Sequence, residues 1–370
     1  MTASTSRRTL PPWAMTIYGV VTAVTFSACS SAPTPLYHFY QQDFDLSPLV
    51  VTIIFASYAF SLLAALLTAG GLSDYVGRRS VTLAAIIISA IVMVLFIVAH
   101  SAAILIAARV VQGFAIGIAT TTLSAAILDT DKARGPLLNS VTAFIGLAIG
   151  SLGAGFLITF APYPAELVYV VLLIITAIGG LFLIAMPETT PGHSGAWASL
   201  RPHVAIPPQA RAAFARITPV NIAAWALGGF YLSLMPSLVR TATGLTSPLV
   251  GASVVSTLMF TAVATGVVLR DLKEADSLMA GTSALALGVL VTLAGVWLHF
   301  VSLMFVGTFV AGIGFGAAFS GVLRTILPLA KADERAGLLS TFYVESYLVF
   351  SMPAIAAGIA APAFGLAATI

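Results

Sequence analysis

Long apolar stretches alternate with short polar connections along almost the whole chain. Each stretch has about the 20 residues that an α-helix needs to cross the hydrocarbon core of a bilayer. Lipid offers no partners to backbone polar groups, so such uninterrupted runs indicate helices rather than barrel strands. The pattern predicts eleven membrane-spanning helices, over residues 13–34, 50–72, 81–99, 102–128, 138–160, 165–186, 218–239, 248–269, 278–298, 301–327 and 337–361.

Basic residues are distributed unevenly among the connections between these spans. With the N-terminus in the cytoplasm, cytoplasmic segments hold 13 of the 16 Lys and Arg residues, and Arg240 is the only one in an external loop. The positive-inside rule therefore predicts a cytoplasmic N-terminus. The 13 residues are Arg7, Arg8, Arg78, Arg79, Lys132, Arg134, Arg201, Arg211, Arg216, Arg270, Lys273, Lys331 and Arg335.

One polar connection, residues 187–217, is much longer than the others and is interrupted by prolines. Its last part, residues 209–217, is basic and can form a short amphipathic helix at the membrane surface. We therefore expect three parts: an N-terminal six-helix bundle at residues 1–186, a cytoplasmic linker at 187–217, and a C-terminal bundle of five helices at 218–370.

A short internal repeat supports two related halves. Residues 134–140 (RGPLLNS) recur 201 positions later as residues 335–341 (RAGLLST), each copy at the start of a span. Parallel repeats of this kind occur in membrane proteins built from two six-helix bundles. The same shift would place a counterpart of the sixth span near 366–387, but the sequence ends at Ile370. We therefore expect the twelfth helix to be missing, either through truncation or in a natural eleven-span variant.

Composition agrees with a polytopic membrane protein. Hydrophobic residues make up 59% of the 370 positions and charged residues 8%, whereas soluble domains carry about 25% charged residues. Cys29 is the only cysteine, which leaves no disulfide framework or cysteine metal site. The sequence has no P-loop and no H-E-x-x-H motif, and its histidines fall in loops or at span ends. We expect no enzyme activity, no cofactor, no metal and no nucleic-acid partner.

The connection between the second and third spans is short, charged and rich in glycine. Residues 70–79 read GGLSDYVGRR. The spacing G-x-x-x-D-x-x-G-R-R resembles the signature loop between helices 2 and 3 of the major facilitator superfamily, with Tyr75 where that family usually has a basic residue. We call residues 70–79 the signature loop. The matching positions are Gly70, Asp74, Gly77, Arg78 and Arg79.

Other segments extend this resemblance over essentially the whole chain. Arg109, Gln112 and Gly113 match the family's R-x-x-Q-G motif at the start of helix 4. The glycine-rich motif of antiporter helix 5 is matched in part, with Ser151 where that motif has proline. Residues 31–37 (SAPTPLY) and 223–229 (AAWALGG) are similar to segments of bacterial drug-exporter-like members.

The resemblance implies an all-α polytopic membrane protein with the major facilitator fold: two pseudo-symmetric helical bundles, with 11 transmembrane helices present (6+5). It implies secondary active transport of a small organic solute by alternating access. Proton-coupled efflux is the expected form, and metabolite uptake by a symporter is the alternative. A non-transporting receptor or a degenerate, truncated transporter is the alternative of another class. The implied partners are a small-molecule substrate, protons and the lipid bilayer, for a monomer in the bacterial cytoplasmic (inner) membrane.

The signature loop is expected to act as a gate. The carboxylate of Asp74 can interact with the unpaired N–H groups at another helix N-terminus, which by resemblance is the start of helix 11 near Gly337. Arg78 could pair with Asp129 or Asp131, and these contacts would break when the protein opens inward. Alternatively, the arginines only set topology and Asp74 only solvates the turn. The residues assigned to the gate are Gly70, Asp74, Gly77, Arg78, Arg79, Asp129 and Asp131.

Two charged residues within spans are candidates for coupling. Arg109 lies in an otherwise apolar run, where a charge usually marks a pathway or a buried pair, and Gln112 shares its helical face. We expect Arg109 to relay protons or to contact an anion, and the alternative is snorkelling to the outer interface. Glu345 is the only acid deep in a span, about 15 Å along the helix from Arg335. Apolar surroundings favour its protonated form, so it could bind and release a proton, or simply hydrogen-bond between helices.

Polar and aromatic residues at helical spacing suggest faces of a substrate cavity. A cavity with aromatic side chains and few charges would suit an amphipathic or weakly charged solute. The alternative is helix packing, where small residues and threonine are common, and this is the expectation for the pairs Gly113/Gly117, Gly146/Gly150 and Gly312/Gly316. The cavity candidates are Tyr18, Thr22 and Thr25 in the first span and Asn221 and Trp225 in the seventh.

Overall fold

The computed structural model describes residues 10–331 and 334–365, and Arg7 and Arg8 lie outside these ranges. All regular elements within them are helical. The long helices are α1 (Pro12–Ser31), α3 (Pro48–Ala69), α5 (Arg78–Ile97), α6 (Ala102–Thr130), α7 (Gly135–Phe160), α8 (Pro164–Leu183), α10 (Arg211–Ser233), α12 (Pro248–Val268), α13 (Glu274–Trp297), α14 (Val301–Ile326) and α15 (Arg335–Phe364). The short ones are α2 (Tyr37–Asp43), α4 (Leu72–Val76), α9 (Ala196–Ser199) and α11 (Met235–Thr243).

The all-helical membrane class predicted from the sequence is confirmed. Within the described residues, ten helical segments are long and apolar enough to span a membrane, and the bent pair α10–α11 makes up to eleven. Apart from the seventh span, the helix ends differ from the predicted ends by at most four residues. Local chemistry sets several of these ends: Ser47, for example, accepts a hydrogen bond from the Val50 N–H at the start of α3 (3.3 Å).

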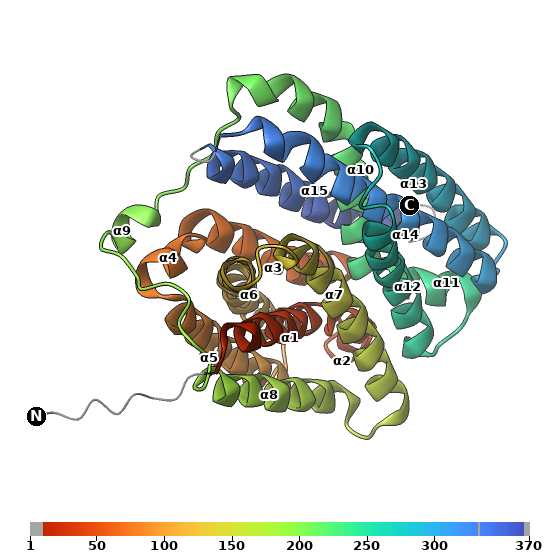
Figure 1. The fold of residues 1–370 in the computed structure, drawn as a ribbon. Coiled ribbons are helices and arrows are strands. Elements are labelled where there is room, and N and C mark those ends of the chain that lie inside the picture. The colour runs from red at the N-terminus through yellow and green to blue at the C-terminus, as the bar shows by residue number, and fades with distance from the viewer. Residues whose placement is uncertain (1–9, 332–333, 366–370) are drawn as a thin grey trace, which may run out of the picture.

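The helices form two groups that lie side by side (Figure 1). The first half contains α1 to α8 and the second half contains α10 to α15, with α9 on the connection between them at the left of the view. Across the boundary, α7 packs on α12 and α3 packs on α15. Helices α3, α6 and α14 end on one side of the molecule, which also holds α4 and the connection between the halves. We call it the linker side and the opposite side the far side.

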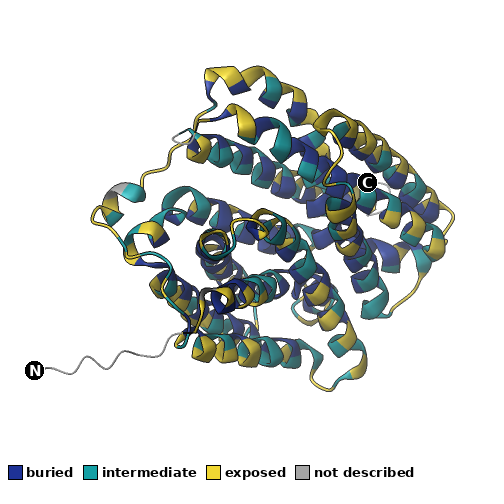
Figure 2. Cartoon of the chain, viewed as in Figure 1, coloured by how far each residue is buried: buried dark blue, intermediate teal, exposed yellow. Residues whose placement is uncertain are grey.

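The outward faces of the helices are apolar, as contact with lipid requires. Figure 2 shows exposed residues along the outer faces and buried residues toward the interior. Aliphatic side chains such as Ile87, Ile91 and Leu290 are exposed on these faces. Trp13 and Trp297 are exposed at helix ends, where tryptophan favours the membrane–water interface.

The seventh predicted span is a broken helix, which corrects the prediction of one continuous span at 218–239. α10 begins at Arg211, so most of the separate surface helix predicted at 209–217 forms the first turns of α10. α10 and α11 are bent by 65° at Leu234. The bend follows from Pro236, which has no N–H to donate to the carbonyl of Leu232, four residues earlier.

The first half contains an equivalent break. α1 ends at Ser31, ahead of Pro33 and Pro35. Pro35 stands 201 residues before Pro236, the same shift as in the sequence repeat. The hydroxyl of Thr34 donates to the carbonyl of Leu232 (2.8 Å), so a side chain at one break satisfies the carbonyl that proline leaves unpaired at the other.

Glycines allow helices to approach closely at three crossings. A Cβ at Gly113 or Gly117 of α6 would collide with α3, and one at Gly312 or Gly316 of α14 would collide with α12. In α7, the same holds for the glycine pair that faces α1. The close packing predicted for the pairs Gly113/Gly117, Gly146/Gly150 and Gly312/Gly316 is confirmed.

We predict that Gly150→Ala destabilises the fold. A Cβ at Gly150 would lie 2.5 Å from Ala28 Cα and against the Ser31 hydroxyl, and overpacking of this kind costs about 1–3 kcal/mol. Gly153→Ala is the matched control, because a Cβ there meets no atom within 4 Å. Thermal unfolding of the detergent-purified variants should show a lower midpoint for Gly150→Ala only. Equal midpoints would contradict the close α1–α7 crossing.

Candidate functional site

A cavity of about 470 Å³ lies between the two halves. Helices α1, α3, α6 and α7 line it from the first half, and α10, α12, α14 and α15 from the second. Its volume is in the range of small-molecule sites, about 300–1,000 Å³. Aromatic side chains from both halves form much of its wall: Phe55, Tyr58, Phe144, Trp225, Phe315, Phe319, Tyr343, Tyr347 and Phe350.

The cavity continues toward the linker side. A second cleft of about 710 Å³ lies between the start of α7 and the ends of α12 and α14, and it shares wall residues, such as Phe144 and Phe319, with the cavity. Phe144 packs edge-on against Phe319, with ring centroids 5.1 Å apart. Both halves thus contribute to a route from the cavity to the linker side.

The far side is closed by direct contacts between the halves. Gly155 of α7 packs against Ala252 of α12, and Gly358 of α15 packs against Thr52 of α3. The Thr34–Leu232 hydrogen bond lies in the same region. The two halves therefore meet on the far side and leave a cleft on the linker side.

Arg109 lines the cavity and is almost fully buried, with 1% of its surface exposed. Its Nη1 donates to the carbonyl of Ser30 (3.0 Å) and to Oε1 of Gln112 (2.6 Å). Its guanidinium lies over the ring of Tyr58, 4.3 Å from the centroid. Arg109 therefore faces the interior and does not reach the outer interface, and Gln112 is its direct partner.

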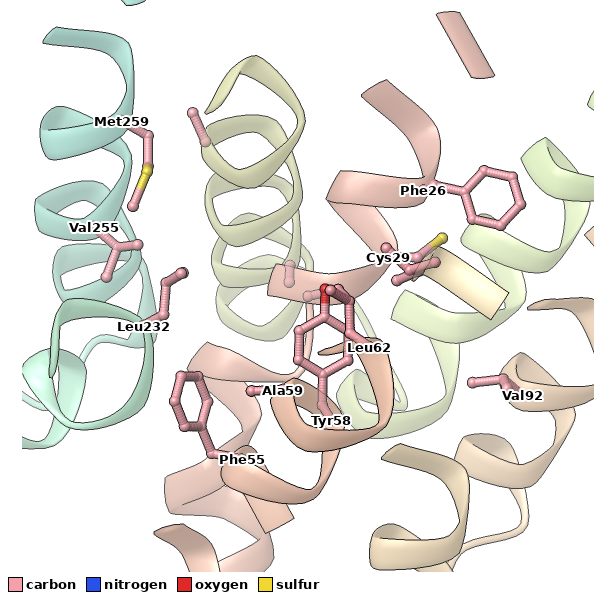
Figure 3. Close-up of a cluster of buried hydrophobic side chains, with 14 of the residues drawn as sticks. Phe26, Cys29, Phe55, Tyr58, Ala59, Leu62, Val92, Leu232, Val255 and Met259 are labelled. Carbon is pink, nitrogen blue, oxygen red and sulfur yellow. The ribbon is translucent and has the colours of Figure 1, made fainter. Parts of the chain in front are cut away.

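The broken end of α1 supplies the acceptors for this pair. Pro33 has no N–H for the carbonyl of Cys29, and Gln112 Nε2 donates to that carbonyl instead (2.8 Å). Ser30 lies in the last turn of α1, where carbonyls lack helical donors, and Arg109 bonds to it. Figure 3 shows Cys29 and Tyr58 at the centre of the buried cluster, with Leu232, Val255 and Met259 opposite.

The candidate site residues of the second half, Trp225, Asn221 and Glu345, do not all lie together. Trp225 lines the cavity, and its buried indole Nε1 has no hydrogen-bond partner in the part of the chain that the structure describes. Asn221 is not among the cavity-lining residues; it is buried and donates to the hydroxyl of Ser346 (3.1 Å). Glu345 is partly buried where α15 packs on α10, and its carboxylate faces Thr218 and Asn221. Both of its carboxylate oxygens are buried. Glu345 does not line the cavity.

The first-span candidates lie on a different face from the one predicted. Tyr18, Thr22 and Thr25 line an apolar groove between α1 and α8, on the periphery of the first half, and the Tyr18 hydroxyl donates to the carbonyl of Gly179 (3.1 Å). The prediction that these three residues line the central cavity is therefore wrong. α1 contributes Ser30 to the cavity instead, and the turn that follows it contributes Thr34, because α6 and α7 pack on the other face of α1.

The signature loop forms a network of charges on the linker side. Arg78 is 7% exposed, and it pairs with Asp74 (2.5 Å) and with Asp129 at the end of α6 (3.2 Å). Its Nη1 donates to the Ser73 hydroxyl (2.6 Å). The Arg78–Asp129 pair is thus present together with the cleft on this side, so it does not depend on closure of that cleft. Asp131 instead accepts a hydrogen bond from the Arg134 N–H (2.9 Å) in the turn before α7.

Glu188, which follows α8, is a member of this network that the sequence analysis missed. It accepts hydrogen bonds from the N–H groups of Arg78 (2.8 Å) and Arg79 (3.0 Å) at the start of α5. Gly77 adopts a φ of +99°, and a Cβ there would lie 2.8 Å from Glu188 Oε2. Glycine is therefore required at position 77 by both backbone conformation and space. The available signal was a lone acid just after a span, near two arginines that need counter-charges.

The expected contact between Asp74 and the start of α15 is not formed in this conformation. Asp74 pairs with Arg78, and no hydrogen bond or ion pair within the described residues joins it to α15. The start of α15 is covered by the connection between the halves: the Ala205 N–H donates to the carbonyl of Gly337 (3.3 Å), and the His203 ring packs against Gly337.

Other site residues carried weaker signals in the sequence. Tyr343, Tyr347 and Phe350 follow helical spacing on α15 and share the cavity wall, so an aromatic stripe could have identified this face. No group of three or more His, Cys, Asp and Glu residues placed to hold a metal occurs in the described part of the chain.

Comparisons with known proteins agree on one family. The model of the Major Facilitator Superfamily matches residues 19–352. An uncharacterized transporter of Rickettsia bellii (strain RML369-C) is 26% identical over 188 residues; the match covers 49% of this chain and 45% of that protein, so the chain aligns with less than half of its relative's length.

Solved structures with the same fold cover nearly the whole chain. The bacterial homolog of the human lysosomal transporter Spinster, inward-facing and unoccupied, has a TM-score of 0.75 at 15% identity, covering 98% of this chain and 84% of that one. The human organic anion transporter MFSD10 has a TM-score of 0.67 at 17% identity (97% and 96% covered). The nucleoside transporter NupG has a TM-score of 0.72 at 12% identity (96% and 95% covered).

We predict that Glu188→Ala destabilises the start of α5. The substitution removes the acceptor of two N–H groups in the first turn of the helix, which costs about 1 kcal/mol. Glu166→Ala is the control, because Glu166 lies exposed in the first turn of α8 and makes no hydrogen bond or ion pair among the described residues. Thermal unfolding in detergent should show the larger decrease for Glu188→Ala, and a larger decrease for the control would contradict this assignment.

Proposed function

This chain belongs to the Major Facilitator Superfamily, and we propose that it exports a small organic solute from a bacterial cytoplasm by proton-coupled alternating access. Membership of this family makes it a secondary transporter rather than an enzyme. In this proposal the solute moves out of the cell, its movement is coupled to protons, and the solute is small. The protein is a monomer in the cytoplasmic membrane with its N-terminus inside. Uptake of a metabolite by symport is the alternative.

The observation that carries the proposal is the cavity, which is closed on the far side and continuous with a cleft on the linker side. The basic residues of the described loops concentrate on the linker side, which the positive-inside rule assigns to the cytoplasm. With that orientation the cavity is open to cytoplasmic solutes, the state in which an exporter binds its substrate and a symporter releases it.

Transport then requires the two bundles, residues 1–186 and 218–370, to rock about the cavity. The far-side contacts at Gly155 and Gly358 would open, and the cleft on the linker side would close. During this closure Asp74 would move from Arg78 to the start of α15, displacing the residues that now cover Gly337. The gate contact implied by the family resemblance is thus assigned to the outward-open state.

Two groups are proposed to couple this motion to protons. Arg109 lies in the cavity and binds the end of α1, so it can respond to the contents of the cavity. Glu345 lies outside the cavity, where α10 and α15 meet, and its carboxylate is buried beside the neutral side chains of Thr218 and Asn221. We propose that it carries a proton there. Release of that proton when α10 and α15 separate would link the proton to the conformational change.

The substrates named for the structurally similar proteins do not identify the substrate of this chain. Those proteins are an organic anion transporter and a nucleoside transporter, among others. At identities of 12–17% they share the fold, and a fold hosts many functions. Only the side chains of this cavity can indicate its substrate.

The proposed function is tested by flux in proteoliposomes. Purified protein is reconstituted, a pH gradient is imposed, and accumulation of a panel of radiolabelled organic solutes is measured against empty vesicles. Solute movement that follows the sign of the gradient supports proton coupling, and the direction of the gradient that drives it distinguishes export from uptake. A thermal shift with a solute, but no flux of any solute, would favour the non-transporting receptor.

We predict that Glu345→Gln uncouples transport from the pH gradient. Glutamine keeps the shape of the protonated acid but cannot release a proton, so gradient-driven flux should fall at least about tenfold while solute exchange without a gradient persists. Glu166→Gln, an exposed acid at the start of α8, is the control. Full gradient-driven flux in Glu345→Gln would remove Glu345 from the mechanism.

We also predict that Asp74→Asn slows transport without destabilising the protein. The Asp74 side chain is 58% exposed, and a surface ion pair contributes about 0–1 kcal/mol, so the unfolding midpoint should change little. Flux should fall about tenfold, because closure on the linker side loses the charge that favours the α15 N-terminus. Unchanged flux at unchanged abundance would contradict the gate.

A further inference from the structure

We propose that the substrate is an amphipathic organic anion, whose acidic group binds at Arg109 and whose apolar part lies among the aromatic residues of the cavity. This inference rests on the proposed transport function and names the substrate class of that site. It is argued from the charge of the cavity, its free hydrogen-bond donors and its walls.

The charge of the cavity is unbalanced. Arg109 is the only charged residue among those that line it, and no Asp or Glu is among them. All partners of its guanidinium are neutral: the Ser30 carbonyl, the Gln112 side chain and the Tyr58 ring. Ion pairs among the described residues involve Arg78 and Arg270, and none involves Arg109. A buried charge without a counter-charge is costly, and a bound anion would supply one.

Two residues of the cavity wall, Arg109 and Trp225, carry buried donors that suit an acidic group. Both hydrogen bonds of the Arg109 guanidinium use Nη1, and its buried Nε has no acceptor in the described part of the chain. The indole Nε1 of Trp225 is also buried without an acceptor. A guanidinium binds the two oxygens of a carboxylate or sulfonate through parallel N–H groups.

The aromatic side chains that line the cavity explain why the substrate should have an apolar part as well as an acidic group. Trp225 lies beside Tyr347 and Phe350, with ring centroids 5.1 and 6.0 Å apart, and Phe144 meets Phe315 across the boundary (5.4 Å). Such walls could also bind an organic cation through cation–π contacts. The positive charge of Arg109 in the same cavity opposes a cation, and a neutral solute would leave that charge unpaired.

The cleft on the linker side has the same sign of charge. Arg134, Arg270 and Arg324 line it, with Glu274 as the only acidic residue among the lining residues. Arg324 Nη1 donates to the carbonyls of Arg270 (2.7 Å) and Leu272 (2.8 Å), while its buried Nε and Nη2 have no acceptor in the described residues. A cleft with a positive excess raises the local concentration of anions, so anions would be favoured from the entrance to Arg109.

Binding of three matched probes to the purified full chain tests the inference. The probes are 2-naphthoate, 2-naphthalenemethanol and 2-naphthylmethylammonium, which share one aromatic ring system and differ in charge, and binding is measured by isothermal titration calorimetry at neutral pH. We expect naphthoate to bind at least about tenfold more tightly than the alcohol, and the ammonium probe most weakly, since hydrogen bonds to charged groups are the stronger ones.

Substitutions at Arg109 assign the preference to this residue. Arg109→Gln should lower naphthoate affinity about tenfold to a hundredfold and leave the affinity for the alcohol unchanged, and Arg109→Lys should retain part of the preference. Arg240→Gln, which removes a positive charge near the far-side surface, should leave all three affinities unchanged. Unfolding midpoints establish that the variants are folded, and if Arg109→Gln does not fold, the ranking of the wild type and of Arg109→Lys decides.

Three results would overturn the inference: equal or cation-favouring affinities in the wild type, undiminished naphthoate affinity in folded Arg109→Gln, or no binding of any probe at millimolar concentration. The outcome is separable from that of the proposed function. Charge-selective binding without flux in proteoliposomes would refute the transport proposal and leave the anion site intact. Proton-driven flux of neutral and cationic solutes, with no preference for anions, would refute the anion site alone.

Discussion

A backbone carbonyl that proline deprives of its donor cannot be left unpaired inside a membrane, and this requirement organises the centre of the molecule. Pro33 frees the carbonyl of Cys29, and Gln112 binds it. Pro236 frees the carbonyl of Leu232, and Thr34 binds it from the other half. The breaks in α1 and α10 thus require polar side chains within the apolar interior, and they fix where the first half, the second half and Arg109 meet.

The same requirement gives Arg109 two roles. Its Nη1 satisfies the end of α1, while its Nε has no acceptor among the described residues and its side chain lines the cavity. A solute that binds Arg109 in the cavity would therefore act directly on the end of α1. Thr34, which contacts α10, lies in the segment that follows. The end of α1 and the turn after it therefore connect solute binding in the cavity with closure of the far side. A protein that alternates between two states is expected to exchange its contacts at such irregular segments.

On the linker side, the buried guanidinium of Arg78 and the more exposed carboxylates around it hold the edge of the first half together through charge contacts. Arg78, Asp74, Asp129 and Glu188 form hydrogen bonds that join α4, α5 and α6 to the segment after α8. Such contacts are individually weak and exchange partners at little cost, unlike the glycine crossings within each half. The first half can therefore move as a rigid unit while the contacts at its edge are exchanged, as alternating access requires.

The sequence by itself determined the helices, their order, the positive-inside bias and the signature loop, because hydropathy, helix length and motif spacing are local properties. It also placed Arg109 beside Gln112 and Arg78 near Asp129, since residues three apart on a helix or at adjoining helix ends meet in most arrangements. Only the tertiary structure decided which face of α1 turns to the cavity, because α1 carries polar side chains on more than one face, at Thr22 and Ser30 for example, and the neighbouring helices determine which of them lines the cavity. The role of Glu188, the contact of Thr34 with Leu232 and the cover over Gly337 depend on partners 110 to 198 residues away, which no local pattern reveals.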